Sequence, residues 1–237
     1  MRQRVGQLPA PTGSQEPEMS LGGVLGRIIK LVLMLFGLFV AFELLLRLFR
    51  RLCPFPVPPT LTRLFSSPVR EASQSRQVTI SRMGLRPGMR VLEVGAGVGR
   101  FTVDAARAVG ADGRLDSIDI EPEMVAGVRE RVQQAGLQNV EARVADVRHL
   151  PFPSATFDVV YLVAVLGSII DKGRALREAR RVLKPSGRLS ITEGMSDADY
   201  LLMDEVVGWA QMVGFELVEE HGNAFLYTLN FRSLLGP

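Results

Sequence analysis

The chain opens with a polar stretch followed by a long apolar one. Residues 1–20 are rich in Pro, Gly and Gln and show no periodicity, which predicts a disordered lead-in. In the apolar segment 21–52, Lys30 and Glu43 are the only charged residues between positions 28 and 46. As a helix rising 1.5 Å per residue, positions 28–46 reach about 28 Å, close to the thickness of a hydrocarbon core. We therefore predict a membrane-anchor helix over 21–52.

The charges near the two ends of this segment leave two arrangements open. Helical spacing puts Arg27 and Lys30 on one side and, on roughly the opposite side, the charged residues of the far end, Glu43, Arg47, Arg50 and Arg51. Charges on different faces suit a spanning helix whose long side chains reach both interfaces. A helix lying flat on the bilayer needs one continuous polar face. We expect the spanning arrangement, with flat anchoring as the alternative.

Beyond the anchor, 53–70 contains five Pro and predicts a stiff, extended linker. From 71 to 237, helical and strand-like stretches alternate, which is typical of a parallel sheet covered by helices on both faces. The expected helices lie at 71–83, directly after a Gly-rich loop at 95–99, and at 122–135, 172–183 and 198–212. The expected strands are 90–94, 113–120, 140–145, 157–163, 187–193, 215–220 and 224–231.

The last two strands are joined only by His221, Gly222 and Asn223, and so tight a connection makes them antiparallel. The pattern thus predicts an α/β, doubly wound, mostly parallel seven-stranded sheet with an N-terminal transmembrane helix. The expected organisation is a disordered N-terminus (1–20), an anchor (21–52), a linker (53–70) and a globular domain (71–237). The Arg-rich part of the helix near 174–181 predicts a solvated face with carboxylate pairs.

Charge is distributed unevenly along the chain, and this distribution bears on which classes of partner the protein can bind. The net charge is +3, but 1–70 holds nine Lys and Arg against three Glu, whereas 71–237 holds 19 Lys and Arg against 22 Asp and Glu. A mildly acidic globular part argues against a nucleic-acid partner. Two His and one Cys leave too few ligands for a zinc site of the usual kind, so we expect no metal.

The loop 95–99 carries the most informative chemistry. Its glycines allow the backbone to bend with positive φ and to approach a ligand closely. Glu93 stands in the strand just before the loop, and Asp119 follows at the end of the next strand. A carboxylate in the place of Asp119 can accept both hydroxyls of a ribose. Glu93 would repel a pyrophosphate and attract an ammonium, so the ligand should contain a ribose and a cationic amine but no phosphate.

Five segments occur in the order and spacing of one known family: VLEVGAGVG at 91–99, DIEPEM at 119–124, ARVADVRHLPFP at 142–153, FDVV at 157–160 and REARRVLKPSGRLSITE at 177–193. On these motifs the chain, over 74–195, resembles the class I S-adenosylmethionine-dependent methyltransferases. The LPF and RVLKPSG segments are similar to those of the quinone and lipid methyltransferases within that family.

The resemblance implies a cofactor site for S-adenosylmethionine. For the amino-acid part of the cofactor, Glu93 would hold the ammonium, and the loop residues Gly95, Ala96, Gly97 and Gly99 would lie against it. Asp119 would bind the ribose hydroxyls. At the adenine, Ile120 would pack on the ring, Asp146 would accept a hydrogen bond from the amino group, and the Val147 backbone N–H would donate to the ring.

Each acidic residue of this set also has a purely structural interpretation. Glu93 could be a strand-end acid in an ion pair, Asp119 a helix N-cap, and Asp146 a turn-forming residue. Ile120 is expected in the core whatever its role.

Methyl transfer from a sulfonium needs mainly alignment, and a general base only where the acceptor must lose a proton. We expect the acceptor beyond the strand ends, near 163–168 and 193–200, where the apolar character favours a greasy molecule. The polar candidates for catalysis are Glu193, Asp197, Tyr200 and His221, of which Asp197 could instead cap a helix and His221 could be a solvated turn residue.

Residues 54–85 would provide the cover of this site and place its mouth near the bilayer. The sequence thus predicts a membrane-anchored methyltransferase acting on a lipophilic small molecule, such as a quinone or a lipid. The catalytic domain should face the cytoplasm, where the methyl donor is made. Alternatives are a tethered, non-catalytic S-adenosylmethionine-binding scaffold and a protein methyltransferase.

Overall fold

The structure is a computed structural model of the 237-residue chain, and it describes residues 21–52, 75–197 and 199–234. Two compact units divide at Leu46, and each is described by itself. The expectations for 1–20 and 53–70, and most of the cover expected over 54–85, lie outside the described residues.

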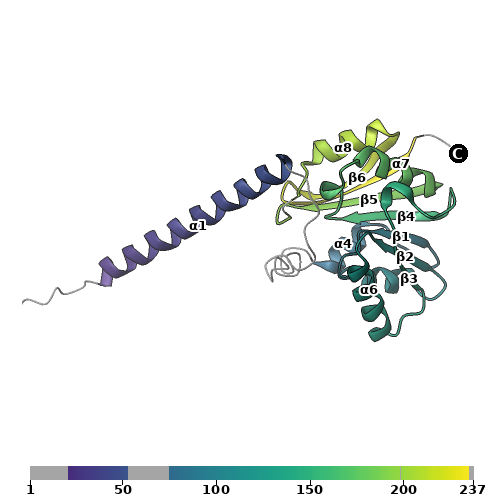
Figure 1. The fold of residues 1–237 in the computed structure, drawn as a ribbon, viewed down its shortest axis with the longest axis horizontal. Helices are drawn as coiled ribbons and strands as arrows, with labels where there is room; N and C mark the ends of the chain where they lie inside the picture. The colour runs from purple at the N-terminus through teal and green to yellow at the C-terminus, as the bar shows by residue number, and fades with distance from the viewer. Residues whose placement is uncertain (1–20, 53–74, 198, 235–237) are drawn as a thin grey trace, which may run out of the picture. The chain divides into compact units, whose positions relative to one another are not determined.

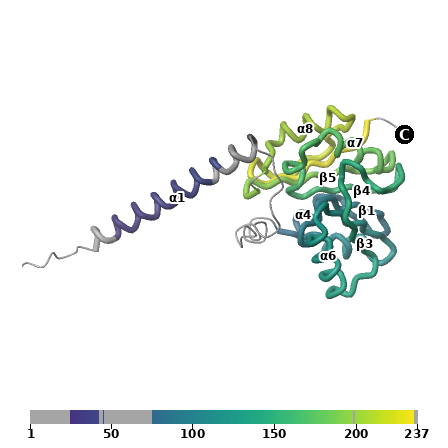
Figure 2. The backbone as a smooth tube through the Cα atoms, viewed as in Figure 1, coloured from purple at the N-terminus to yellow at the C-terminus, as the bar shows by residue number. Residues whose placement is uncertain are grey.

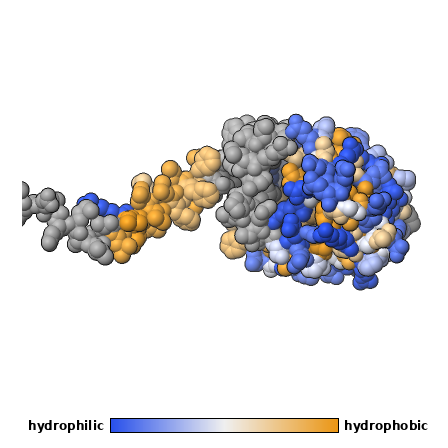
Figure 3. All heavy atoms as spheres, turned by 90° about the horizontal axis from the view of Figure 1, so that it is seen from below, coloured by the Kyte–Doolittle hydropathy of each residue, from blue (hydrophilic) through white to orange (hydrophobic). Residues whose placement is uncertain are grey.

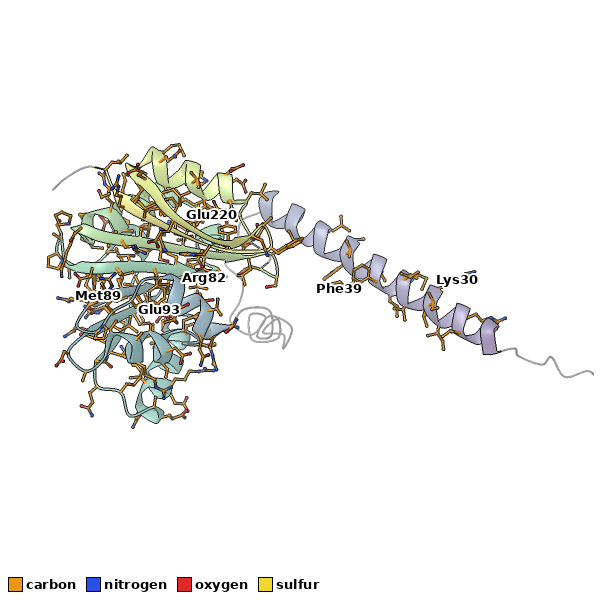
Figure 4. All side chains as sticks on the ribbon, turned by 180° about the vertical axis from the view of Figure 1, so that it is seen from behind. Lys30, Phe39, Arg82, Met89, Glu93 and Glu220 are labelled. Carbon is orange, nitrogen blue, oxygen red and sulfur yellow. The ribbon has the colours of Figure 1, made fainter. Side chains whose placement is uncertain are left out.

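The first unit ends at Leu46 and contains most of helix α1, Leu21–Leu52. Its stretch Leu25–Phe42 is long and apolar enough to cross a membrane, and none of it is buried within the protein. Figure 3 shows this stretch as an almost unbroken apolar surface, and Lys30 and Phe39 project from the helix in Figure 4. Length and composition are also those of a signal sequence, so these features leave membrane insertion as a prediction.

The second unit is a seven-stranded sheet between two layers of helices (Figure 1). The strands lie in the order β3-β2-β1-β4-β5-β7-β6, with β7 antiparallel to both of its neighbours and the other pairs parallel. Their bounds are β1 Arg90–Val94, β2 Arg114–Asp119, β3 Val140–Val144, β4 Phe157–Val163, β5 Leu183–Gly194, β6 Phe215–Asn223 and β7 Leu226–Ser233. This confirms the predicted doubly wound, mostly parallel sheet.

The helices alternate with the strands along the chain, as the tube in Figure 2 traces. They are α4 Arg76–Arg82, α5 Thr102–Val109, α6 Pro122–Gln134, α7 Lys172–Val182 and α8 Met203–Met212, with short 3₁₀ helices η1 Val147–His149 and η2 Leu166–Ser168. Apolar residues of α7 and α8 pack with β4, β5 and β7 in one core cluster, and those of α4 and α5 pack with β1, β2 and β4 in another. The two faces of the sheet are therefore closed by different helices.

Several predicted boundaries near the C-terminal end were wrong. Strand β5 starts at Leu183, directly after α7, because Leu183 pairs with Phe157 across a bulge in the β4–β5 ladder. Helix α8 starts at Met203 instead of 198, where the Glu205 carboxylate accepts the Leu202 N–H at 2.9 Å.

The turn between β6 and β7 also lies further along the chain than predicted. His221 and Gly222 continue β6, paired with Thr228 and Tyr227, and the turn falls at residues 224–225. The Asn223 side chain accepts the N–H groups of Phe225 and Leu226 at 2.9 and 3.2 Å, which moves the bend past His221.

Candidate functional site

The Gly-rich loop follows β1 at the carboxyl edge of the sheet, where parallel α/β sheets bind their ligands. Gly95, Gly97 and Gly99 all have positive φ, at 70°, 53° and 76°. A Cβ on Gly95 would lie 2.5 Å from the Val165 side chain, whereas one on Gly97 would meet nothing within 4 Å. Gly95 is thus required by close packing, and Gly97 leaves open space beside the backbone.

Four of the five N–H groups of this loop, all but that of Val98, donate to acceptors within the protein. Those of Gly95 and Ala96 donate to the Ile118 carbonyl at 2.8 and 3.1 Å, and that of Gly97 donates to the Asp119 carboxylate at 2.8 Å. The Gly99 N–H donates to the Ala96 carbonyl at 2.9 Å. A loop that binds pyrophosphate points several N–H groups at its ligand. The bonding seen here instead fits the predicted ligand without phosphate.

Glu93, labelled in Figure 4, is the last residue but one of β1. It is buried, with 2% of its surface exposed. One of its carboxylate oxygens accepts from the Thr102 hydroxyl at 2.6 Å and from the Ser117 hydroxyl at 2.7 Å. Burial raises the pKa of this carboxyl above its usual value, and the neighbouring hydroxyl groups offset only part of that effect. No cation of the described residues forms an ion pair with Glu93, so its charge is left for a cation from outside.

Glu93 belongs to a polar row that crosses one face of the sheet in register. Ser117 of β2 lies opposite Glu93, which lies opposite Tyr161 of β4; the row continues to Ser190 of β5 and Asn230 of β7. All five residues are buried. A polar row through a sheet interior costs stability unless its groups are bonded. Its presence next to the loop favours a functional role.

Asp119 ends β2 beside the loop. Its two carboxylate oxygens accept the N–H groups of Gly97 and Glu121, at 2.8 and 3.0 Å. Helix α6 begins only at Pro122, after Glu121, so Asp119 does not cap it. Each carboxylate oxygen has a second lone pair, which leaves capacity for the hydroxyls of a ribose.

Ile120, the next residue, was expected in the core and is instead 57% exposed. It lies beyond the end of β2, where no helix covers it. An exposed aliphatic side chain directly beyond Asp119 suits an adenine ring, whose apolar face would cover it.

Asp146 and Val147 lie after β3, on the far side of the same edge. The Asp146 carboxylate caps η1 by accepting the Arg148 N–H at 2.9 Å and also binds the Arg148 guanidinium, at 2.7–3.0 Å. The side-chain bonds to Arg148 lower the pKa of Asp146, so this carboxylate stays ionised. Asp146 therefore has the turn-forming role, and its contact with adenine stays a prediction. Val147 packs its side chain in the core.

The two loops expected around the acceptor lie against each other. Val165, just before η2, covers Gly95, and a Cβ on Gly167 would collide with the Asp199 carbonyl. The Ala164 N–H donates to the Thr192 carbonyl at 2.8 Å, which ties the first loop to β5.

Three of the four polar candidates gather under these loops. Glu193 is 1% exposed, and its Oε1 has no hydrogen-bond partner among the described residues. Burial raises the pKa of Glu193 well above its usual value, and the negative charge of Asp197 adds to this. Tyr227, opposite Glu193 on β7, stacks edge-on with Tyr200 at 5.9 Å between ring centroids. The Tyr200 hydroxyl donates to the Ala224 carbonyl at 2.5 Å.

Asp197 does not cap α8, which starts at Met203; its carboxylate accepts the Asp199 N–H at 3.3 Å. His221 stands apart from the other three. It pairs with Thr228, whose side chain bonds Thr192, on the sheet face opposite to Glu193 and Tyr227. Its Nε2 lies 3.6 Å from the Glu219 carboxylate. The structure does not bring His221 to the other candidates.

The sequence missed Lys172 and Tyr227. The Lys172 ammonium donates to the carbonyls of Gly167 and Ile169 at 3.1 and 2.8 Å, and burial lowers its pKa. Tyr227 donates its hydroxyl to the Leu201 carbonyl at 2.6 Å. Neither lies in a motif, and only the pairing of β5 with β7 places Tyr227 beside Glu193.

Comparison with known proteins agrees with this geometry. A family model described as a methyltransferase domain matches residues 85–224. The ubiquinone/menaquinone biosynthesis C-methyltransferase UbiE of Teredinibacter turnerae is 39% identical over 128 residues, which are 54% of this chain and 51% of that protein. The UbiE of Idiomarina loihiensis is 40% identical over 119 residues, 50% of this chain and 47% of that protein. The chain thus spans about half the length of these curated relatives.

Solved structures share the fold. A SAM-dependent methyltransferase from Aquifex aeolicus superposes with a TM-score of 0.68 at 23% identity, over 76% of this chain and 100% of that one. The [4+2]-cyclase SpnF superposes with a TM-score of 0.60 at 20% identity, over 68% of this chain and 80% of that one. The matched family model, together with the strand order and the loop geometry, shows that the chain belongs to the methyltransferase domain family and has the Rossmann-like fold of S-adenosylmethionine-dependent methyltransferases.

Proposed function

We propose that this protein is an S-adenosylmethionine-dependent methyltransferase that methylates a lipophilic, quinone-like molecule at a membrane. The observation that carries the proposal is the loop after β1. A buried carboxylate (Glu93) without a cationic partner among the described residues lies on one side of it, and Asp119 lies on the other. Four of the five loop N–H groups are already bonded, which disfavours a phosphorylated coenzyme.

The residues present fit the cofactor. Glu93 would bind its ammonium, Asp119 its ribose hydroxyls and Ile120 its adenine, while Gly97 leaves room at the backbone. Asp146 and the Val147 N–H would contact the adenine edge, as the family resemblance implies. When bound, the cofactor supplies an activated methyl group and a neutral leaving group.

The curated relatives are named as C-methyltransferases of quinone biosynthesis, which supports a carbon acceptor here. Forming a carbon–carbon bond on an aromatic or enol carbon requires that carbon to lose a proton. Glu193 is the group we assign to accept or relay it, because its Oε1 has no partner among the described residues and it lies at the carboxyl end of β5. Asp197, Tyr200 and Tyr227 would tune and position this carboxyl. His221 is not assigned a part.

We further propose that α1 anchors the protein in the membrane where a lipophilic acceptor dissolves, with the globular unit on the cytoplasmic side. Its exposed apolar stretch Leu25–Phe42 supports this proposal. A spanning helix is the arrangement favoured by the charges at its two ends.

Isothermal titration of the full chain in detergent with S-adenosylmethionine, and separately with NADH, tests the cofactor assignment. Binding of the first and not the second is expected, and the reverse would overturn the proposal. Incubating membranes that contain the protein with methyl-labelled donor, followed by mass spectrometry of the lipid extract, identifies the acceptor. Cofactor binding without any labelled product would instead support the non-catalytic scaffold, and label on protein would support a protein methyltransferase.

A further inference from the structure

The outer face of α7 concentrates positive charge. Ala175, Leu176 and Ala179 of this helix pack in the core, while its arginines lie on the opposite side. The sequence predicted that these arginines pair with carboxylates. Among the described residues, Arg181 is the arginine of α7 that forms such a pair, with Glu178 at 2.8 Å.

These arginines line a hollow of about 790 Å³ between α7 and the segment after β3. Its walls are Arg148, His149, Leu150, Asp171, Arg174, Arg177, Glu178, Arg180 and Arg181. Hydrogen bonds hold the two walls together: the Arg174 side chain donates to the Arg148 carbonyl at 3.1 Å, and the Leu150 N–H donates to Glu178 at 2.9 Å. The hollow is therefore a fixed feature of the fold.

Both carboxylates of the hollow are committed to other groups. Asp171 caps α7 by accepting the Arg174 N–H at 2.9 Å, and Glu178 binds Arg181 and the Leu150 N–H. By contrast, Arg177 and Arg180 form no hydrogen bond or ion pair with the described residues. Arg148 and Arg181 are paired with Asp146 and Glu178, so the positive charges of the hollow that have no carboxylate partner among the described residues are those of Arg174, Arg177 and Arg180. They lie in a domain that is mildly acidic as a whole.

We infer that this arginine-lined hollow binds the phosphate group of an anionic phospholipid. The planar fork of a guanidinium matches two phosphate oxygens at once, and several arginines around one hollow suit a group that carries a full negative charge. We take a lipid as the source because the same chain carries the exposed apolar helix α1, which is proposed to insert into a membrane, and membranes present anionic headgroups. The inference rests on the membrane part of the proposed function and not on methyl transfer.

The arginine-lined hollow lies next to the residues proposed to bind the cofactor and the acceptor. Arg148 in the wall of the hollow also binds Asp146, the residue proposed to contact adenine. Helix α7 follows directly after η2, in the loop region proposed to face the acceptor. A headgroup held here would keep that edge of the sheet at the bilayer surface, where a lipophilic acceptor leaves the membrane.

Hydrogen exchange of the full chain in lipid nanodiscs tests the inference. Peptides covering 146–152 and 172–182 are compared between discs of phosphatidylcholine alone and discs in which a third of the lipid is phosphatidylglycerol. Exchange about threefold slower in the anionic discs is expected, as for a site that is mostly occupied. The double variant Arg177→Glu/Arg180→Glu should lose this protection. The matched control Arg86→Glu/Arg107→Glu, whose arginines lie outside the hollow, should keep it.

Equal exchange in both kinds of disc would overturn the inference, and so would loss of protection in the control variant. Inorganic phosphate added to the neutral discs distinguishes the source: equal protection by free phosphate would refute a lipid ligand. Titrating the same samples with S-adenosylmethionine separates this inference from the proposed function. Cofactor binding without protection refutes the lipid site alone, and protection without cofactor binding refutes the methyltransferase alone.

Discussion

Glu93 of β1 and Tyr161 of β4 lie directly opposite each other on neighbouring parallel strands, and both are almost fully buried. Burial raises the pKa of each group, and the Glu93 charge raises that of Tyr161 further. A carboxyl in this setting ionises reluctantly until a cation arrives. If Glu93 binds the cofactor ammonium as proposed, cofactor binding is linked to the ionisation of this carboxyl.

The first prediction concerns this link. We expect the affinity of the full chain for S-adenosylmethionine to increase as the pH is raised from about 5 to about 8, because the raised pKa of Glu93 keeps part of the protein protonated at the lower pH. Glu93→Gln should weaken binding roughly 10- to 100-fold, the value of a charge-assisted hydrogen bond, and flatten the pH profile. Isothermal titration measures both.

Glu220→Gln is the matched control, since Glu220 is exposed on β6. Wild-type affinity that is equal at both pH values would show that Glu93 does not bind the ammonium.

The second prediction concerns Glu193 and stability. Its folded-state pKa is raised above the unfolded value, so its contribution to stability is present at low pH and is lost as the pH rises through the folded pKa. Glu193→Gln removes the ionisation. The variant should therefore gain stability relative to wild type as the pH rises, by about 1.4 kcal/mol for each unit of raised pKa.

Thermal unfolding of the full chain in detergent at several pH values checks this. The same variant should lose product formation while keeping cofactor affinity, because Glu193 is assigned to the acceptor and not to the cofactor. If the Glu193→Gln variant formed product at the wild-type rate, Glu193 would not be the group that accepts or relays the proton.

The third prediction compares two glycines of the loop. Both Gly95→Ala and Gly97→Ala force an alanine into positive φ, at a cost of about 1–2 kcal/mol. Only Gly95→Ala also meets Val165, at 2.5 Å. It should therefore lower the unfolding temperature more than Gly97→Ala does, and adding Val165→Ala should restore part of the loss. Equal effects of the two single variants would mean that Val165 does not press on Gly95 in solution.

The fourth prediction concerns the anchor. The full chain should remain in membranes through alkaline carbonate washing, because Leu25–Phe42 is exposed and apolar apart from Arg27 and Lys30 near its start. The double variant Leu35→Arg/Phe39→Arg should be released into the supernatant. Each Arg placed near the middle of a membrane-spanning helix raises the free energy of membrane insertion by about 2.5–3.5 kcal/mol. Leu234→Arg, a change of an exposed residue in the other unit, serves as the control. Wild-type protein found in the wash would argue for a helix that lies flat.

The local sequence pattern was sufficient to predict the bounds of the central strands β1 and β4 and the position of the Gly-rich loop. Strands β1 and β4 begin and end where predicted, because each is an apolar run bounded by polar or turn-forming residues. Glu93 and Asp119 were predicted to flank the loop, and they do, because both follow from the strand ends of one βαβ unit.

Other features depend on contacts between distant segments and could not be read locally. The start of β5 depends on a bulge opposite Phe157, and the position of His221 depends on the Asn223 side chain that sets the turn. The exposure of Ile120 depends on which helices reach the carboxyl edge. The pairing of Glu193 with Tyr227 arises because β7 is inserted beside β5.

That insertion also constrains the order in which the protein can fold. Strand β7 follows the other six in the chain, yet it lies between β5 and β6 and forms ladders with both. During synthesis on the ribosome, β6 emerges before it has any strand to pair with, and β5 presents an open edge until β7 leaves the exit tunnel. For that interval a nascent chain already bearing an apolar helix carries two unprotected strands, so its surroundings during translation should matter for its yield.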